Sequence, residues 1–470
     1  MTIEMTPEEF RRLGYAVVDM LSTQLTAVQS GLARPLMPDT LSRALTDQPL
    51  PEQPTPVEDL LKRVQDEILP YPMGNQNPRF FAWVNSTAAP LAVLGEFVAA
   101  AHNASVAGGH HAATYVEHAV LNWLKEILTY PRSAGALLTS GGSVANLIGL
   151  ATMRHVKAPQ NVRTHGLHDQ PQPLVVYAST QAHSCIQKSV ELLGFGSQYL
   201  RRIPANEAYQ IDVEALKAQI HQDRVNGLLP VCVAASAGTV NTGAVDPLDQ
   251  LADLCAAEGL WLHVDGAYGG VGILDPDVSA LYKGIERADS IAIDPHKWLY
   301  MPIECGCALV KDAEAMRAAF SLLPDYLRND RELPWFSEYG VQQTRGFKAL
   351  KLWLVMQQIG VEGFRHLIGA NNQLAALLAH KITQQPDFEL VSGGPLSIVC
   401  FRYVPSNHPD VDGLNAQLPT RLQQDGRVFI TGTRLKDRPV LRMCIVNFRT
   451  TEADLDLALQ VIREVGAAIP

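Results

Sequence analysis

The sequence predicts an α/β protein whose largest domain holds a mostly parallel sheet with helices on both faces. Between about residue 135 and residue 310, short apolar runs alternate with segments of helical spacing. The runs are continuously apolar, which is typical of strands buried on both faces. At 470 residues the chain is too long for one small core, so roughly two or three structural units are expected. The clearest apolar runs are 136–138, 174–176, 230–235 and 291–293.

The first segment of the chain is predicted to be helical. Thr6 is a suitable N-cap and Glu9 stands where it completes a capping box. Apolar residues then follow at helical spacing through Leu25, so this helix must bury a stripe on something. Residues 31–58 are rich in proline and polar residues and are predicted to form an extended connector, followed by a helix over 57–68.

The last third of the chain is predicted to form a smaller α+β domain. A long amphipathic helix begins at Phe347 and leads away from the sheet. Strands are expected near 397–403 and 440–447, and helices near 411–423 and 451–466. The expected division is an N-terminal helical segment, 1–79, a large domain, 80–350, and a small C-terminal domain, 351–470.

Composition excludes several classes of protein. The net charge of −10 argues against a nucleic-acid partner or an anionic membrane surface. No apolar run approaches the roughly eighteen residues of a membrane span, and the N-terminus lacks the basic and apolar regions of a secretory signal. The odd count of seven cysteines favours reduced thiols and a cytoplasmic location.

The cysteines do not predict a metal site or a catalytic thiol. Cys305 and Cys307 have no second pair at zinc-ligand spacing, so both are interpreted as strand residues and no metal site is predicted. Cys185 lies two residues after His183 and is interpreted as a small buried residue.

One lysine stands out by its place in the sequence. The apolar run 291–293 passes into Asp294, Pro295, His296 and Lys297. Proline cannot donate to a sheet ladder, so Lys297 is predicted to lie just beyond a strand's carboxyl end, where open α/β sheets bind ligands. Apolar neighbours disfavour the ammonium form, which makes Lys297 a candidate Schiff-base nucleophile.

Other polar residues follow the ends of neighbouring predicted strands. Asp265 ends the strand that begins near Leu260, and His183 follows the strand over 173–177. Ser140, Gly141, Gly142 and Ser143 link a short strand to a helix, which gives converging N–H groups suited to a phosphate. There is no GxGxxG fingerprint and no GxxxxGK[ST] loop, so a nucleotide is not the first expectation.

These segments together resemble a known family. The glycine-rich turn, His-Val-Asp-Gly-Ala-Tyr at 263–268 and Asp-Pro-His-Lys-Trp at 294–298 resemble the fold-type I enzymes that use pyridoxal 5′-phosphate (PLP). Among these, which share the aspartate aminotransferase-like fold, the chain is similar to the group II amino-acid decarboxylases over about residues 6–465. The resemblance implies PLP as cofactor, an amino-acid substrate and a homodimer in which segment 1–79 packs across the partner.

The resemblance also implies roles for individual residues. Lys297 would bond to the PLP aldehyde, Asp265 would pair with the pyridine N1–H, and His183 would stack on the ring and contact the substrate. Thr239 and Ala267 would lie beside the cofactor. The phosphate contacts implied are Gly142, Ser143, Ser290 and His296, with Thr344 reaching the partner's phosphate. The substrate pocket implied includes Trp83 and Ser86.

Tyr326 bears on the reaction outcome. In relatives that decarboxylate, a tyrosine at this position is thought to protonate the reacting carbon, and relatives with phenylalanine form an aldehyde with oxygen. The chain keeps the tyrosine, so amine and CO2 are the predicted products, with an aromatic substrate favoured by Trp83. Asn85, Ser105 and the pair His110–His111 differ from the family's usual residues, so the substrate side chain stays open.

Four alternatives remain at this stage. On the same fold, the chain could decarboxylate an acidic amino acid or form an aldehyde by oxygen-dependent chemistry. A non-catalytic scaffold would be expected to lack Lys297 or Asp265, and both are present. A Rossmann-type dehydrogenase is disfavoured because the dinucleotide motif is missing.

Overall fold

The computed structural model describes residues 3–322 and 333–470, which divide into two compact units. The larger unit comprises Val84–Ala376 and Ser392–Val399. The other comprises Met1–Trp83, Leu377–Val391 and Cys400–Pro470. This grouping differs from the expected three-part division, because the N-terminal segment joins the C-terminal elements in one unit.

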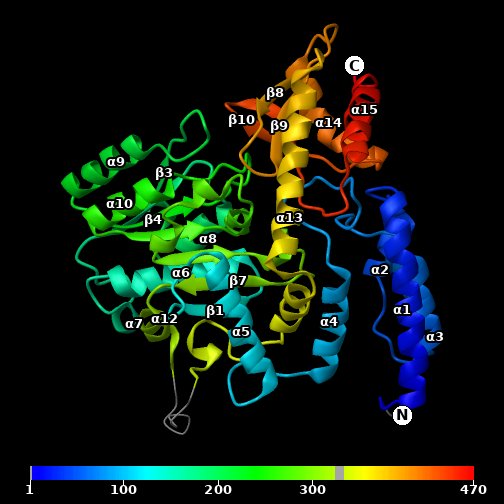
Figure 1. The fold of residues 1–470 in the computed structure, drawn as a ribbon, viewed down its shortest axis with the longest axis horizontal. Coiled ribbons are helices and arrows are strands. Elements are labelled where there is room, and N and C mark those ends of the chain that lie inside the picture. The colour runs from blue at the N-terminus through cyan, green and yellow to red at the C-terminus, as the bar shows by residue number, and fades with distance from the viewer. Residues whose placement is uncertain (1–2, 323–332) are drawn as a thin grey trace. The chain divides into compact units, whose positions relative to one another are not determined.

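The larger unit is built on a seven-stranded sheet, of which Figure 1 labels β1, β3, β4 and β7. The strand order is β1-β7-β6-β5-β4-β2-β3. Only β7 runs antiparallel to its neighbours, which confirms the predicted mostly parallel sheet. The strands are β1 (Gly135–Thr139), β2 (Leu174–Ser179), β3 (Leu200–Ile203), β4 (Leu229–Ser236), β5 (Trp261–Asp265), β6 (Ser290–Ile293) and β7 (Gly306–Val310). Strand β3 was not predicted.

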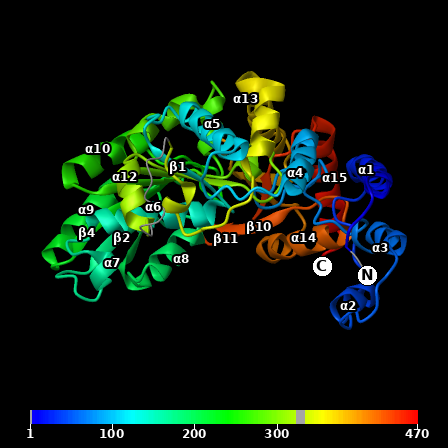
Figure 2. The same ribbon diagram turned by 90° about the horizontal axis from the view of Figure 1, so that it is seen from below.

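Helices cover this sheet on both sides. In Figure 2, α10 and α5 lie on one side and α8 lies on the other. The helices of the larger unit are α4 (Pro90–His102), α5 (Ala112–Ile127), α6 (Gly142–Lys157), α7 (Val162–His165), α8 (Ser184–Leu192), α9 (Val213–Val225), α10 (Leu248–Glu258), α11 (Pro295–Trp298) and α12 (Ala313–Phe320). The long helix α13 (Ala349–Thr383) is interrupted at Gly360, whose backbone is not helical.

The parallel strands end side by side. In the register of the sheet, Ser236 of β4 lies opposite Asp265 of β5, and Asp265 lies opposite Ala292 of β6. Every residue of β1, β2, β5, β6 and β7 is buried, so their positions are fixed by packing on both faces. The loops that follow β4, β5 and β6 therefore begin at one edge of the sheet.

The second unit combines the N-terminal helices with a four-stranded sheet in the order β10-β11-β9-β8. Its helices are α1 (Pro7–Ser30), α2 (Asp39–Thr46), α3 (Val57–Arg63), α14 (Val411–Asp425) and α15 (Glu452–Gly466). Its strands are β8 (Phe388–Ser392), β9 (Ile398–Tyr403), β10 (Thr431–Leu435) and β11 (Arg438–Cys444). Helix α2 lies within the segment predicted to be extended, and β8 and β10 were not predicted.

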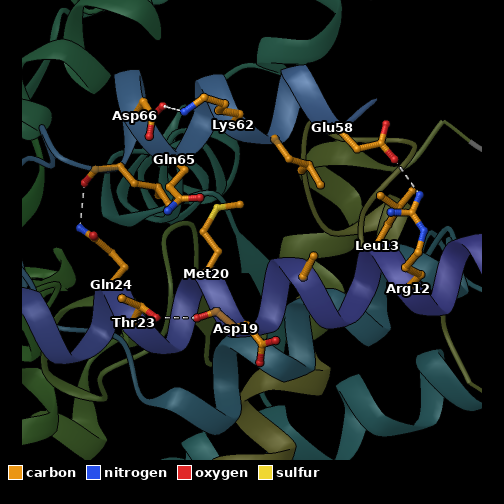
Figure 3. Close-up of a pocket in the computed structure, with 13 residues that line it drawn as sticks. Arg12, Leu13, Asp19, Met20, Thr23, Gln24, Glu58, Lys62, Gln65 and Asp66 are labelled. Atoms are coloured by element: carbon orange, nitrogen blue, oxygen red, sulfur yellow. Dashed lines mark hydrogen bonds and ion pairs between the residues drawn. The ribbon is translucent and has the colours of Figure 1, made fainter. Parts of the chain in front are cut away.

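Helix α1 begins as the sequence predicted. The Thr6 hydroxyl accepts a hydrogen bond from the Glu9 N–H (3.2 Å), and Glu9 Oε2 accepts one from the Thr6 N–H (3.0 Å). Figure 3 shows Met20 of α1 within a cleft of about 710 Å³ between α1 and α3. The Arg12–Glu58 ion pair (2.8 Å) bridges the two sides of this cleft. No helix in the described ranges is long and apolar enough to span a membrane.

Candidate active site

Lys297 lies on the short helix α11, directly beyond β6. Its Nζ atom is 3.0 Å from Asp294 Oδ2, and the Lys297 side chain is 23% exposed while that of Asp294 is 3% exposed. Trp298, Leu299 and Met301 are buried beside it, as the sequence predicted. The apolar setting expected for Lys297 is nevertheless incomplete, because a carboxylate lies directly beside its amine. The sequence analysis did not predict this ion pair. The three-residue spacing of Asp294 and Lys297 could have indicated it, because residues three apart meet on a helical turn.

Asp265 ends the strand next to β6. It is 8% exposed, and its Oδ1 atom accepts a hydrogen bond from the Ala267 N–H (3.1 Å). The following Gly266 N–H donates to the carbonyl of Ala292 in β6 (2.9 Å). The acid and the lysine therefore stand at the ends of two adjacent strands, as the sequence predicted from their positions.

His183 is the N-cap of α8, with its side chain open to solvent. Its Nδ1 atom accepts a hydrogen bond from the Cys185 N–H (3.2 Å), so the neutral ring carries its proton on Nε2. Enough protein surrounds the ring that desolvation lowers the pKa of His183. The charges of Asp265, Lys297 and Asp294 also act on this pKa, after desolvation.

The glycine-rich turn leads into the amino terminus of α6. A methyl group at Gly142 would come within 2.8 Å of both the Ala267 Cβ and Asp294 Oδ2, so only glycine permits this approach. Ser143, the next residue, is exposed. The first N–H groups of a helix have no intrahelical partner, and the helix dipole favours an anion there.

Asp294 also lies against this turn. Its Oδ1 atom is buried and has no hydrogen-bond partner among the described residues. A carboxylate oxygen accepts hydrogen bonds, so Oδ1 fits a group that brings a donor to the turn. The first N–H groups of α6 are donors for an anion, and the Lys297 amine lies 3.0 Å from the other Asp294 oxygen. This donor set fits a cofactor that carries a phosphate and an aldehyde, such as PLP.

His296 and Ser86 belong to the same neighbourhood. A methyl group at Gly141 would lie 3.2 Å from His296 Cε1. His296 Nδ1 accepts a hydrogen bond from the Cys305 N–H (3.0 Å), and burial lowers the pKa of this histidine. The Ser86 hydroxyl donates to the carbonyl of His296 (3.2 Å). Both residues thus lie near the Gly-rich turn and Lys297.

The structure does not bring Ser290 to this edge of the sheet. Ser290 is the first residue of β6, and its hydroxyl is bonded to Trp261 Nε1 and His263 Nδ1, each at 2.8 Å. Three residues of strand, about 10 Å, separate it from Ile293 at the other end. The prediction that Ser290 contributes to phosphate binding disagrees with this placement. The resemblance implied this contact, but Ser290 begins the strand whose other end leads to Lys297.

The remaining predicted residues lie in varied settings. Thr239 is buried in the turn after β4, where its hydroxyl is 2.9 Å from Thr242 Oγ1 and accepts a hydrogen bond from the Ala244 N–H (3.1 Å). Thr344 is exposed, immediately before the buried Arg345.

Two predicted site residues are not among the described residues of the larger unit. Trp83 belongs to the other unit, where it is 49% exposed and its ring lies 5.4 Å from that of Phe429. Tyr326 lies outside the described residues.

The fold and these side chains define an α/β enzyme site with an amine, a carboxylate and an anion-binding helix terminus at one sheet edge. A family model described as "Pyridoxal-dependent decarboxylase conserved domain" matches residues 38–404. The chain belongs to the pyridoxal-dependent decarboxylase family, so it is an amino-acid decarboxylase of fold type I that uses PLP.

Individual relatives align over nearly the whole chain. An aromatic-L-amino-acid decarboxylase of Bacillus atrophaeus is 35% identical, covering 99% of this chain and 96% of the relative. A phenylacetaldehyde synthase of Petunia hybrida is 31% identical, with coverage of 98% and 94%. The crystal structure of Oryza sativa TDC with PLP and tryptamine superposes with a TM-score of 0.92 at 28% identity, covering 100% of both chains.

Proposed function

We propose that the chain decarboxylates an aromatic L-amino acid to its amine and CO2, with Lys297 and Asp265 at the two ends of PLP. The observation that carries the proposal is the placement of these two residues at the ends of adjacent strands, β6 and β5. The aromatic preference is supported by the 35% identical aromatic-L-amino-acid decarboxylase.

The chain's own side chains support distinct tasks. When bound, PLP supplies an aldehyde that condenses with amines and a pyridine ring that accepts the electron pair left by lost CO2. Lys297 Nζ is the amine that would hold the cofactor aldehyde. The Asp265 carboxylate would accept a hydrogen bond from the ring N–H and so favour the protonated nitrogen.

The groups around these two residues orient cofactor and substrate. The amino terminus of α6, at Gly142 and Ser143, binds the phosphate, with His296 beside it. His183, whose pKa is lowered by desolvation, would be neutral near pH 7. Its ring would stack on the pyridine, with the Nε2 proton available to the substrate carboxylate. Tyr326 would supply the proton that the reacting carbon needs for the amine product.

The test uses purified protein and its Lys297→Ala variant. Wild-type protein is expected to bind PLP, turn yellow and retain the colour covalently after borohydride reduction, with the label on the peptide that contains Lys297. CO2 release across the twenty amino acids and hydroxylated aromatics then identifies the substrate. Borohydride labelling of another lysine, or no PLP binding, would contradict the proposal.

Aldehyde formation is the second candidate, favoured by the 31% identical phenylacetaldehyde synthase. Tyr326 separates the two outcomes. Amine, aldehyde and peroxide are measured for wild type and Tyr326→Phe. Wild type is expected to give amine, and the variant is expected to shift toward aldehyde and peroxide. Unchanged amine output in the variant would remove Tyr326 from the mechanism.

The proposal includes a cytoplasmic homodimer. Helix α1 has no buried residue and exposes Phe10 (55%) and Val18 (44%), an apolar surface that a second copy would cover. None of the seven cysteines forms a disulfide, which suits a reducing compartment. Sedimentation of wild type and of Phe10→Glu/Val18→Glu tests the dimer. The variant is expected to dissociate, and a monomeric wild type would refute this part of the proposal.

A further inference from the structure

We propose that a one-way chain of five hydrogen bonds orients the Asp265 carboxylate, and that Cys185 is the positioning residue at its end. The inference rests on the proposed role of Asp265 toward the PLP ring. The chain of side chains, here called the relay, is formed by Trp261, Ser290, His263, Asn146, Cys185 and Asp265.

The relay is continuous and buried. Trp261 Nε1 is 2.8 Å from Ser290 Oγ, which is 2.8 Å from His263 Nδ1. His263 Nε2 is 2.6 Å from Asn146 Oδ1. The Asn146 amide nitrogen is 3.3 Å from Cys185 Sγ, which is 3.7 Å from Asp265 Oδ2. Each of the six residues is at most 8% exposed.

Secondary structure explains why these residues meet. Trp261, His263 and Asp265 alternate along β5 and therefore share one face of the strand. Helix α6 crosses that face and brings Asn146. A methyl group at Gly149 of α6 would come within 2.9 Å of the His263 ring, so glycine gives the relay its space.

The two ends of the relay fix its direction. The indole nitrogen of Trp261 can only donate, and an ionised carboxylate can only accept. The Ser290 hydroxyl accepts from Trp261 and therefore donates to His263 Nδ1. His263 then donates from Nε2 to the Asn146 carbonyl oxygen, which leaves the Asn146 amide group to donate to Cys185. The thiol proton of Cys185 is left for Asp265 Oδ2.

The protonation of the two middle groups agrees with this direction. The direction requires a neutral His263, and burial lowers the pKa of His263 to about 4. It also requires a protonated thiol, and burial raises the pKa of Cys185 well above its ordinary value. Each of the five hydrogen bonds then joins one donor to one acceptor.

The relay acts on the orientation of one carboxylate. Asp265 Oδ1 is held by the Ala267 N–H, and Oδ2 is held by the Cys185 thiol. Two fixed donors set the plane of the carboxylate, while each oxygen keeps a further lone pair for the ring N–H. Without the thiol, Oδ2 loses one donor and the Asn146 amide loses its acceptor, so the carboxylate plane is no longer fixed.

The experiment compares three variants of the PLP-loaded enzyme. Cys185→Ala removes the final donor, whereas Cys185→Ser keeps a donor and an acceptor. Cys255→Ala is the matched control, because Cys255 is equally buried, in α10, and is not in the relay. The pyridine nitrogen resonance is measured across pH with ¹⁵N-labelled PLP, together with kcat, KM and the PLP dissociation constant.

Cys185→Ala is expected to lower the pH at which the ring nitrogen loses its proton, and to lower kcat about fivefold with little change in KM. Cys185→Ser is expected to restore the resonance and the rate to within about twofold. Cys255→Ala is expected to change neither. A wild-type resonance in Cys185→Ala, or a serine variant as impaired as the alanine variant, would overturn the relay.

Two further measurements separate the relay from the proposed function. In cofactor-free protein, the infrared S–H stretch lost in Cys185→Ala is expected at a lower frequency than that lost in Cys255→Ala. Equal frequencies would count against the thiol–carboxylate bond. If Asp265→Asn alters the nitrogen resonance but Cys185→Ala does not, the relay alone fails. If Asp265→Asn leaves the resonance unchanged, the proposed role of Asp265 fails and the relay fails with it.

Discussion

Replacing Arg345 by methionine is expected to destabilise the protein strongly. Arg345 forms an ion pair with Glu117 of α5, and the two side chains are 1% and 0% exposed. Its guanidinium also donates to the carbonyls of Val106 (2.7 Å) and Leu138 (2.6 Å). Arg345→Met keeps most of the apolar stem but leaves the Glu117 carboxylate buried and without its counter-ion.

The expected loss follows from this burial. Breaking a buried pair from one side costs about 3–5 kcal/mol of unfolding free energy, because an uncompensated charge remains inside. The control is Arg365→Met, which breaks the Arg365–Glu362 pair, whose side chains are 43% and 82% exposed. That change is expected to cost less than about 1 kcal/mol. Urea unfolding of both variants measures the difference.

The dependence on pH gives a second check. Burial raises the pKa of Glu117 above its ordinary value, and Arg345 opposes that rise. In Arg345→Met the opposition is gone, so the folded state holds the Glu117 proton more tightly than the unfolded state. The deficit of the variant is therefore largest above the folded pKa and shrinks as pH falls toward the unfolded pKa.

Two results would refute this reasoning. One is a loss for Arg345→Met no larger than that for Arg365→Met at pH 7. The other is a loss that stays constant as the solution is acidified. The double change Glu117→Met/Arg345→Met removes both charges and is expected to recover most of the lost stability.

Three further predictions follow from single contacts. Gly142→Ala is expected to weaken PLP binding at least tenfold and to cost about 1–3 kcal/mol, because its methyl group would meet two atoms at 2.8 Å. Gly14→Ala, which meets nothing within 4 Å, is expected to leave the PLP dissociation constant unchanged. Burial raises the pKa of Asp246 to about 6, so the folded state binds its proton more tightly. The free energy of unfolding should therefore fall by about 3 kcal/mol as the pH rises from about 4 to about 6. Asp246→Asn should remove this pH dependence, measured by urea unfolding at each pH. Thr6→Ala is expected to cost about 1 kcal/mol, measured by urea unfolding, because it removes the N-cap of α1.

The large sheet was predictable because its buried strands are continuous apolar runs in the sequence. Continuous apolar runs indicate burial on both faces, and the residues after those runs indicate the ligand edge. Lys297 and Asp265 were found in this way. Strand β10 was missed because its residues alternate between half-buried and exposed, and it pairs with β11 at one end of its sheet.

Contacts between distant segments were not predictable from local patterns. Cys185 was correctly expected to be buried, but its contact with Asp265 joins residues eighty positions apart. Ser290 was assigned to the phosphate from the family resemblance, whereas its hydroxyl bonds to Trp261 and His263. Pairings of this kind depend on which helix crosses which strand.

All seven cysteines are buried and none forms a disulfide, and they are spread over both units of the chain. A thiol reagent can therefore reach a cysteine only when the segment around it opens. The rate of alkylation at each cysteine then reports how readily that part of the molecule opens, with no engineered probe. Comparing those rates with and without PLP would map how far the cofactor stiffens the chain beyond the residues it touches.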